Sequence, residues 1–401
     1  KPSYVHAVVV VTALAVTAPV LVAVGSAPAT ASNHAEFTQG QYVETRGDVA
    51  EITVDVGRGD TGTVTVGSDE KGYLVRIVVT DGGDGRVTLE FNTLLSQQGS
   101  EAYSVADSSD KIDRVNVVNG VPDTLDALGY TLNIYSGEKS DNFDDISDDQ
   151  AILSLRERPT TEVTTLVAPG TQGSLSQSDI ESETATDTEK AAIGDWVVFE
   201  FSGVPGLEGY LAREGGSGST NDRVRDLFTT DGDPYTMEIF EEDPGLNTEP
   251  IQLHEQLTEE NSDVIVDLED NTVYVVFDAE SGLTDRPIRG DYVTRLTVDG
   301  FDFADTFVDS EETSENVLTF GPPSVSITNK NAFATRNGEI AGTTTVAPGT
   351  AFTVTLQTKE GVIPPFVGEK RVTVTKDQTF SATFDLAEQA EGDNYTVQVK
   401  G

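Results

Sequence analysis

The chain of 401 residues contains no cysteine, one methionine, one tryptophan and three histidines. Without cysteine it can form neither disulfides nor thiolate metal sites. The histidines, His6, His34 and His254, stand far apart in the sequence. A nucleophile needs an adjacent base to be activated, and most of the common arrangements use histidine or cysteine. We therefore assign no catalytic residue, and we expect His254 to be a surface or capping residue of a non-enzymatic protein.

Positive charge is also scarce, with 25 Lys and Arg against 69 Asp and Glu, a formal net charge of −44 and a pI near 4.1. No basic stripe is present to neutralise phosphates, which excludes nucleic acid as a partner. Carboxylates at this density repel one another in dilute buffer. Molar salt shortens the Debye length to about 3 Å and so screens most of that repulsion. We expect a protein of an extreme halophile whose stability rises with KCl or NaCl. The alternative is a calcium-loaded extracellular protein at ordinary salinity.

The first 31 residues predict a secretory signal peptide. Residues 7–25 are apolar apart from two threonines, and small residues follow up to Ala29-Thr30-Ala31, an A-x-A cleavage pattern. A retained membrane anchor is the alternative reading, since 19 residues of this type just span a bilayer. Pro19 and the small residues favour the signal peptide, and hence a secreted protein located at the cell surface.

From Phe37 onward, short alternating apolar runs are separated by Gly, Asp, Asn and Ser, which is the pattern of strands and turns. Segments 263–268 and 272–277 predict a hairpin with a short polar turn. Helix is expected only weakly, over 175–190 and 250–260. The predicted fold class is all-β, with tandem antiparallel β-sandwich (Ig-like) domains and little helix. The strongest predicted strands are 51–56, 63–66, 74–79, 87–91, 130–135, 196–201 and 293–298.

Composition suggests where the domains begin and end. We expect a first β-sandwich over 37–158, a second over 193–322 and a C-terminal Ig-like domain over 323–401, truncated at its end. Residues 159–192, rich in Thr and Ser, are expected to be a connection, and Pro322-Pro323 marks the second boundary. Residues 324–401 hold eight acids and seven bases, so their net charge is −1, and the first 323 residues carry the other −43. The last domain is electrostatically different, which makes it a candidate contact module.

The pentapeptide VAPGT occurs twice, at 167–171 and 346–350. Proline followed by glycine favours a type II turn, because Pro presets φ at the first corner and Gly accepts φ > 0 at the second. Alternating residues follow the second copy but not the first. We interpret the pair as one turn used twice, with only the second copy joining two strands of a sandwich.

Acidic loops are the candidate cation sites. Segments 81–85, 141–149 and 231–233 offer hard oxygen ligands of the kind that Ca²⁺ prefers. None matches the spaced EF-hand loop, because Gly83 occupies a ligand position in the nearest match. The metal ligands are therefore unknown, and no cofactor is expected other than possible structural calcium.

Two further motifs belong to loops. Arg-Gly-Asp occurs at 46–48, 58–60 and 289–291, and we interpret each as a turn before a strand rather than as an adhesive signal. Asn394-Tyr395-Thr396 is the N-x-[ST] sequon of the chain and makes Asn394 the predicted N-glycosylation site. Residues 160–188 are rich enough in Thr and Ser to carry O-linked sugars or to be a solvated linker.

Taken together, these segments resemble haloarchaeal secreted surface glycoproteins of the S-layer type. The similarity to their repeated β-domain, to the opening of their next domain and to their C-terminal Ig-like domain extends over most of residues 37–401. The segments that carry it are 63–68, 73, 78–85, 87–93, 192–198, 203–209, 340–350, 379–385 and 392–396.

The resemblance implies a glycosylated S-layer or S-layer-associated protein at the cell surface. Its partners would be other surface-layer subunits or cell-envelope proteins, glycans and divalent cations. A membrane anchor would lie only in a C-terminal segment that the 401 residues lack.

Two other functions stay open at this point. An adhesin or carbohydrate-binding module would present exposed aromatic residues on one sheet, and the residues to inspect are Trp196, Tyr210, Tyr235 and Tyr274. A secreted hydrolase would hold two carboxylates about 5–10 Å apart in a deep pocket.

Overall fold

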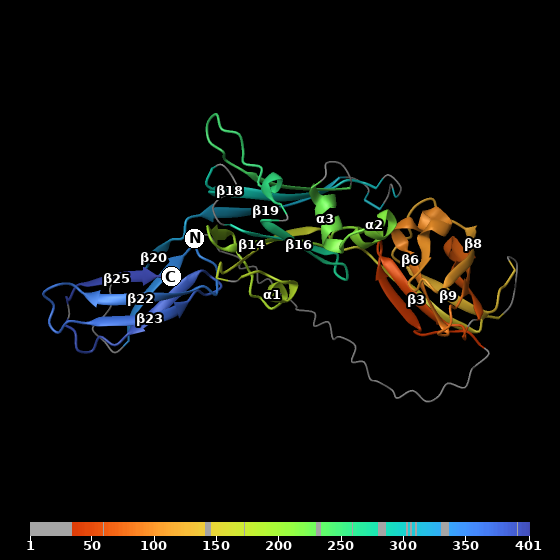
Figure 1. Cartoon of the computed structure of the whole chain (residues 1–401), viewed down its shortest axis with the longest axis horizontal. Helices are drawn as coiled ribbons and strands as arrows, with labels where there is room; N and C mark the ends of the chain where they lie inside the picture. The colour runs from red at the N-terminus through yellow and green to blue at the C-terminus, as the bar shows by residue number, and fades with distance from the viewer. Residues whose placement is uncertain are drawn as a thin grey trace, which may run out of the picture.

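The computed structural model describes residues 34–401, except for 59, 141–145, 172, 230–233, 259, 280–285, 302–303, 305–306, 309–310, 330–336 and 391. The predicted signal peptide, residues 1–31, therefore lies outside the described residues. The all-β fold class is confirmed, because six sheets account for most of the described elements. Figure 1 shows three β-units arranged end to end, with the second unit in the middle.

Unit 1 is a sandwich of a four-stranded and a six-stranded sheet, ordered β1-β3-β6-β7 and β2-β10-β9-β4-β5-β8. Apolar side chains alternate along these strands, so each sheet turns one buried face toward the other. The parallel pairing of β2 with β10 is the exception to the antiparallel pattern in this unit. The elements are β1 Glu36–Phe37, β2 Gln41–Thr45, β3 Val49–Asp55, β4 Thr61–Ser68, η1 Asp69–Lys71, β5 Tyr73–Thr80, β6 Arg86–Asn92, η2 Thr93–Ala102, β7 Tyr103–Val105, β8 Lys111–Asn119, β9 Gly129–Ser136 and β10 Asp149–Arg156.

Unit 2 packs a sheet ordered β12-β11-β14-β17-β16 against a sheet ordered β13-β19-β18-β15. The predicted hairpin is confirmed, since β16 and β17 pair antiparallel. In this unit, β13 and β19 form the parallel pair. The elements are β11 Glu162–Ala168, α1 Gln177–Glu181, β12 Thr186–Asp187, β13 Lys190–Ala192, β14 Trp196–Ser202, α2 Leu207–Glu214, α3 Thr220–Thr229, β15 Tyr235–Glu241, η3 His254–Gln256, β16 Ser262–Asp267, β17 Thr272–Asp278, β18 Gly290–Val298 and β19 Glu312–Gly321.

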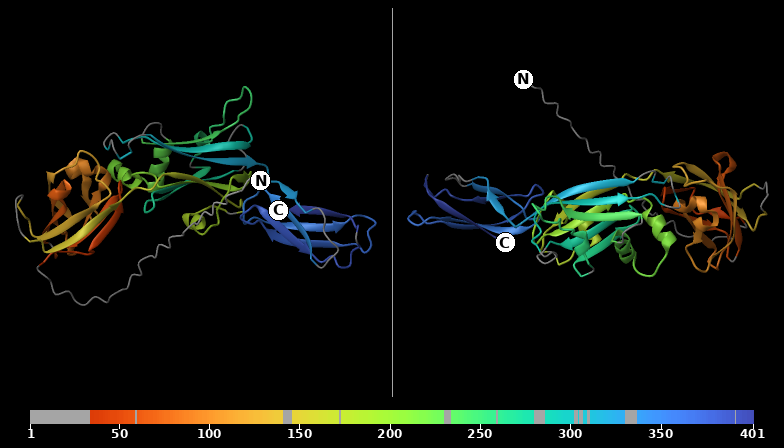
Figure 2. Two further views of the ribbon diagram at one scale, coloured as in Figure 1. Left: turned by 180° about the vertical axis from the view of Figure 1, so that it is seen from behind. Right: turned by 90° about the horizontal axis from the view of Figure 1, so that it is seen from above.

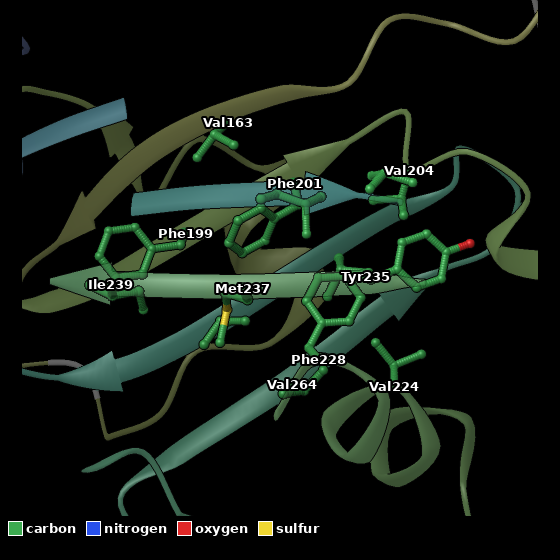
Figure 3. Packing of buried hydrophobic residues seen from close by; sticks show 14 of the residues in the cluster. Val163, Phe199, Phe201, Val204, Val224, Phe228, Tyr235, Met237, Ile239 and Val264 are labelled. Carbon is green, nitrogen blue, oxygen red and sulfur yellow. The ribbon is translucent and has the colours of Figure 1, made fainter. Parts of the chain in front are cut away.

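The core of unit 2 corrects the prediction that 159–192 is a connection. Strand β11 pairs with β14 over seven residues, from Glu162 to Ala168. Figure 3 shows Val163 of this strand in the same cluster as Phe199 and Phe201, and both Val163 and Val167 are buried. Threonine is β-branched and favours strands, so a Thr-rich composition hid a buried strand.

Aromatic rings fill the same core. The Phe228 ring lies between Phe201 and Tyr235, with centroid separations of 5.8 Å on both sides. Phe228 belongs to α3, which the sequence analysis did not predict, and neither was α2 predicted. The expected helices over 175–190 and 250–260 are only the short α1 and η3. Both missed helices are short, with two or three apolar positions at helical spacing, which is too weak a signal among so many strands.

Unit 3 is smaller, with two three-stranded sheets ordered β20-β21-β24 and β23-β22-β25. Its buried side chains alternate as predicted along β22, where Phe352, Val354 and Leu356 face the core. The strands are β20 Val325–Ile327, β21 Gly338–Thr344, β22 Ala351–Thr358, β23 Val367–Thr373, β24 Thr379–Phe384 and β25 Tyr395–Lys400. Within the described residues, no helix has the length and apolarity that a bilayer crossing needs.

Candidate functional site: two buried carboxylates at the junctions between units

The first junction joins units 1 and 2 through glycines that let two backbones meet. Gly47 precedes β3 with φ +99°, and a Cβ on it would lie 2.4 Å from Phe307 Cζ and 2.9 Å from Gly206 Cα. A Cβ on Gly209, in α2, would lie 2.0 Å from Gly47 O. Real Cβ atoms do not approach so closely, so only glycine permits this packing.

Asp48 is sealed inside this junction. Its side chain is 2% exposed, and Asn271 Nδ2 of unit 2 donates a hydrogen bond of 2.7 Å to Asp48 Oδ2. The other carboxyl oxygen, Oδ1, has no hydrogen-bond partner among the described residues. Burial raises the pKa of Asp48 to about 8, and the nearby carboxylates of Glu208 and Glu44 add to the shift. Asp48 is therefore mostly a neutral carboxylic acid at pH 7.

Two more hydrogen bonds cross the first junction. Asn92 Nδ2 of unit 1 donates to Gly209 O at 2.7 Å, and Val49 N donates to Glu208 Oε2 at 2.9 Å. Burial, followed by the hydrogen bond and neighbouring acids, leaves the pKa of Glu208 raised to about 6. Leu94 of unit 1 packs into the hydrophobic core of unit 2, so unit 1 contributes a side chain to that core.

Two arginines lie at the rim of this junction: Arg46 of unit 1, and Arg158, which lies between β10 and β11. Arg46 and Arg158 place their guanidinium carbons 5.9 Å and 5.8 Å from the centre of the Phe307 ring. Arg158 also forms an ion pair with Glu312 of β19. Cation–π contacts of this kind contribute about 0.5–2 kcal/mol each, depending on desolvation.

The second junction joins units 2 and 3, and it brings the two VAPGT copies together. Asp195, 4% exposed, accepts hydrogen bonds from Ala192 N at 3.1 Å and from Ala347 N at 2.9 Å. Gly170 N, in the first copy, donates to the same carboxylate. Ala347 belongs to the second copy and is fully buried in the core of unit 2.

The two copies do not share one turn, which corrects the sequence interpretation. Gly349 has φ +84° and Thr350 N donates to Ala347 O, as the predicted type II turn requires. Gly170 does not have a positive φ. The turn of the first copy is at Gly170 and Thr171, and a Cβ on Gly170 would lie 1.6 Å from Gly194 O, so glycine is needed there for close approach rather than for a positive φ. The pair makes one contact site around Asp195.

Backbone N–H donors keep the pKa of Asp195 low enough for the carboxylate to be ionised at neutral pH. Burial raises its pKa to about 6, against the opposing effect of the three backbone N–H groups. Asp195 is therefore ionised at pH 7, and its hydrogen bonds are charge-assisted. Two contacts at the rim complete this junction: Gln378 Nε2 donates to Lys190 O at 3.2 Å, and Lys376 pairs with Glu183.

The remaining predicted site residues lie apart from both junctions. Asn394 is exposed immediately before β25, and nothing in the structure tests its glycosylation. His254 is half-buried, and its Nδ1 accepts a hydrogen bond of 3.0 Å from Ile239 N, which is a structural role. His34 lies at the surface beside Asp148.

The four aromatic residues that an adhesin would need do not form an exposed platform. Tyr210 and Tyr235 belong to the core of unit 2, and Tyr274 is buried beneath α1. Trp196 is half-buried against the same cluster as Tyr274.

The first Arg-Gly-Asp motif forms the predicted turn before β3, whereas Gly290 and Asp291 of the third motif are the first residues of β18 and pair with β19, which corrects the prediction of a turn there. Asp48 of the first motif is buried, so it is not available to a receptor. Gly290 of the third motif has φ +89°, and Asp291 accepts a hydrogen bond from Thr319 Oγ1 at 2.6 Å. The second motif contains residue 59, which is outside the described residues.

The candidate calcium loops remain untested. In 81–85, Asp81 uses its carboxylate oxygens to accept hydrogen bonds from Gly83 N at 2.8 Å and Gly85 N at 2.9 Å. Residues 231–233 and the first half of 141–149 lie outside the described residues. In the described part of the chain, no three His, Asp or Glu side chains are grouped closely enough to hold a metal ion.

Three tandem β-units with buried polar junctions define an elongated multi-unit β-protein, and comparisons with known proteins refine that class. The chain is similar in sequence to haloarchaeal cell surface glycoproteins. It is 30% identical over 383 residues to a "Cell surface glycoprotein" of Haloferax gibbonsii, covering 90% of this chain and 42% of the relative. It is 28% identical over 404 residues to "Cell surface glycoprotein 1" of Haloarcula hispanica, covering 91% and 43%. The resemblance expected from the sequence motifs is thereby confirmed, and the chain spans less than half the length of these relatives.

Two further matches add little about function. A family model described as "Domain of unknown function (DUF7827)" matches residues 28–137, most of unit 1. Among solved structures, the tetra-tandem repeat in the extending region of a large adhesion protein is 14% identical, covering 91% of this chain and 72% of that chain. Its TM-score of 0.18 is too low to indicate a shared arrangement.

Proposed function

We propose that the chain is a non-enzymatic structural protein of a haloarchaeal cell surface, either an S-layer subunit or an S-layer-associated glycoprotein. The observation that carries the proposal is the pair of buried junctions, because they fix the three units relative to one another. A mobile linker would leave units free to reorient, whereas hydrogen bonds and core residues that cross each junction resist that motion. The two relatives are named as cell surface glycoproteins, which supports a location at the cell surface.

The mechanism is mechanical and electrostatic. Sandwich cores supply stability, and the exposed carboxylates of units 1 and 2 hold water and cations around the protein in concentrated salt. The excess of acids over bases works against compactness unless salt screens it, which fits a protein that functions outside the cell in brine. Glycans on Asn394 and divalent cations between carboxylates belong to the same proposal.

The test is to locate the chain in the native envelope and to reconstitute it. Cryo-electron tomography of cells that carry a tagged chain should place it within the surface lattice. Purified chain should form two-dimensional arrays when divalent cations are added in molar salt. A chain that lies only on scattered appendages, and that never forms arrays, would support the adhesin reading instead.

The stiffness that the proposal requires has its own measurement. Small-angle X-ray scattering of the full chain in molar KCl should give the extended profile calculated for the arrangement in Figures 1 and 2. A profile that requires an ensemble of bent arrangements would contradict the role given to the junctions.

A further inference from the structure

The sheet β23-β22-β25 of unit 3 presents one solvent-exposed face, opposite its buried one. Along this face the pairing registers align side chains in rows, so Thr353 of β22 lies between Arg371 of β23 and Lys400 of β25. We call this surface the unit 3 face. It consists of Thr353, Thr355, Gln357, Val367, Glu369, Arg371, Thr396, Gln398 and Lys400.

The charge on the unit 3 face is unusual for this protein. It carries two cations and one carboxylate, Glu369, although the chain has a net charge of −44. Neither Arg371 nor Lys400 forms an ion pair among the described residues, and both are exposed. Eight cations of units 1 and 2 form ion pairs with nearby carboxylates: Arg46, Lys111, Arg114, Arg158, Arg213, Arg225, Arg286 and Arg295. Arg371 and Lys400 are thus available to an acidic partner.

A surface of complementary charge lies at the first junction. A groove there is lined by Glu44, Glu51, Glu208 and Glu269, with no lysine or arginine in its lining. We call it the acidic groove; its other lining residues are Gln39, Tyr42, Val43, Val49, Ala50 and Leu268.

The acidic groove carries an electrostatic cost in a single copy. Glu51 of β3 lies directly opposite Glu90 of β6, and like charges in that position destabilise a sheet. Burial raises the pKa of Glu44, and the carboxylates of Glu51 and Glu269 contribute to that shift. A cation from a partner would relieve this repulsion.

We propose that the unit 3 face of one copy docks on the acidic groove of a second copy, with Arg371 and Lys400 against the groove carboxylates. The acidic groove lies between units 1 and 2, and unit 3 lies beyond the far end of unit 2 in Figures 1 and 2, so one copy does not satisfy its own groove. The contact is head-to-tail. Such contacts close into rings or continue as open arrays, and a surface layer requires one or the other. This inference rests on the proposed function and names the contact that would build the layer.

Charge reversal tests the docking in the full chain. Arg371→Glu and Glu51→Arg should each weaken self-association at least tenfold, measured by sedimentation equilibrium in molar KCl. Glu51→Arg keeps an exposed strand position and gains an opposite charge beside Glu90, so we expect it to fold. Lys359→Glu makes the same charge change at the other end of β22 and should leave association unchanged.

Mixing the two variants gives the sharpest result. The Arg371→Glu chain keeps an intact acidic groove, and the Glu51→Arg chain keeps an intact unit 3 face. Equal amounts should therefore regain association, because the intact unit 3 face of one variant meets the intact acidic groove of the other. Association of Arg371→Glu equal to that of the unchanged chain, or a mixture that stays monomeric, would overturn the docking.

Cross-linking places the contact, because the chain has no cysteine of its own. Thr353→Cys mixed with Gln39→Cys should give dimers with a short bismaleimide. Ser381→Cys is the control, since β24 presents it on the other sheet of unit 3. Cross-links that are as frequent with Ser381→Cys as with Thr353→Cys would contradict the proposed face.

The outcomes separate this inference from the proposed function. If the chain lies in the envelope lattice and Arg371→Glu still forms arrays, the docking is wrong and the surface role stands. If Arg371→Glu loses association but the chain is absent from the lattice, the docking stands and the surface-layer role is wrong. If Glu51→Arg abolishes Ca²⁺ binding and array formation while Arg371→Glu changes neither, the groove holds divalent cations instead, and the docking is overturned.

Discussion

Each junction between units contains one buried aspartate, and the two aspartates differ in their ionisation state at neutral pH. Asp195 accepts three backbone N–H groups, and its pKa reaches only about 6. Asp48 accepts one amide from Asn271, and its pKa reaches about 8. Each donor favours the ionised form, so the number of donors separates the two values at similar burial. At neutral pH the second junction is held by a carboxylate and the first by a carboxylic acid.

The largest effect should come from removing the carboxylate of the second junction. Asp195→Ala leaves the N–H groups of Ala192, Ala347 and Gly170 without their acceptor, and each buried orphan costs about 1–3 kcal/mol. We expect a loss of roughly 3–5 kcal/mol in the free energy of unfolding.

The single tryptophan, Trp196, lies next to Asp195 and reports the transition by fluorescence in urea. Asp377→Ala removes an exposed carboxylate from unit 3 and is the matched control. If both variants unfold at the same urea concentration, Asp195 does not hold the junction.

The second prediction uses pH to separate the junctions. The pKa of Asp48 is raised on folding, so its contribution to stability is complete below pH 4 and is lost as pH rises toward about 8. Asp48→Asn removes the titrating group, so the variant should gain on the order of 5 kcal/mol relative to the unchanged chain between pH 4 and pH 8. For Asp195 the same loss should be smaller and complete near pH 6.

Urea unfolding of the unchanged chain and of Asp48→Asn across this range measures the difference. Other carboxylates titrate in both proteins, so the informative quantity is the difference between the two curves. A difference that does not change with pH would show that Asp48 has the same protonation in the folded and unfolded chain.

The sequence predicted the strands well because their signal is local. Alternating residues such as those of β22 show which face is buried without knowledge of any partner. The missed strand β11 is the instructive exception, since its Thr-rich segment is recognised as a strand only beside β14. Short helices such as α2 are stabilised by packing at the first junction and give little periodic signal.

The candidate site could be predicted only in fragments. The repeated VAPGT and the first Arg-Gly-Asp motif were both noticed, and each turns out to supply residues to a junction. Their partners, Asp195 and Asn271, have no distinguishing neighbours in the sequence. Contacts between residues 152 or 223 positions apart are set by how whole units pack, which local patterns do not encode.

The third prediction opposes junction packing to helix propensity. Gly209 lies inside α2, where alanine would ordinarily stabilise a helix by about 0.5–1 kcal/mol. At this position the added Cβ would lie 2.0 Å from Gly47 O across the first junction. We therefore expect Gly209→Ala to destabilise by roughly 1–3 kcal/mol and to speed proteolysis between units 1 and 2. Gly40→Ala, with no atom near its Cβ, is the control.

The smallest losses of stability should come from substitutions at the rims of the junctions, and the loss should be larger at the first junction than at the second. Arg158 pairs with Glu312 and lies over Phe307, and its side chain is 18% exposed, so Arg158→Ala should cost about 1–2 kcal/mol. Lys376 pairs with Glu183 where both side chains are about 70% exposed, so Lys376→Ala should cost less than about 0.5 kcal/mol. Because molar salt screens exposed pairs most, raising KCl should erase the Lys376 effect and leave most of the Arg158 effect. If Arg158→Ala and Lys376→Ala lose the same stability at each salt concentration, the guanidinium of Arg158 contributes no more than an exposed charge does.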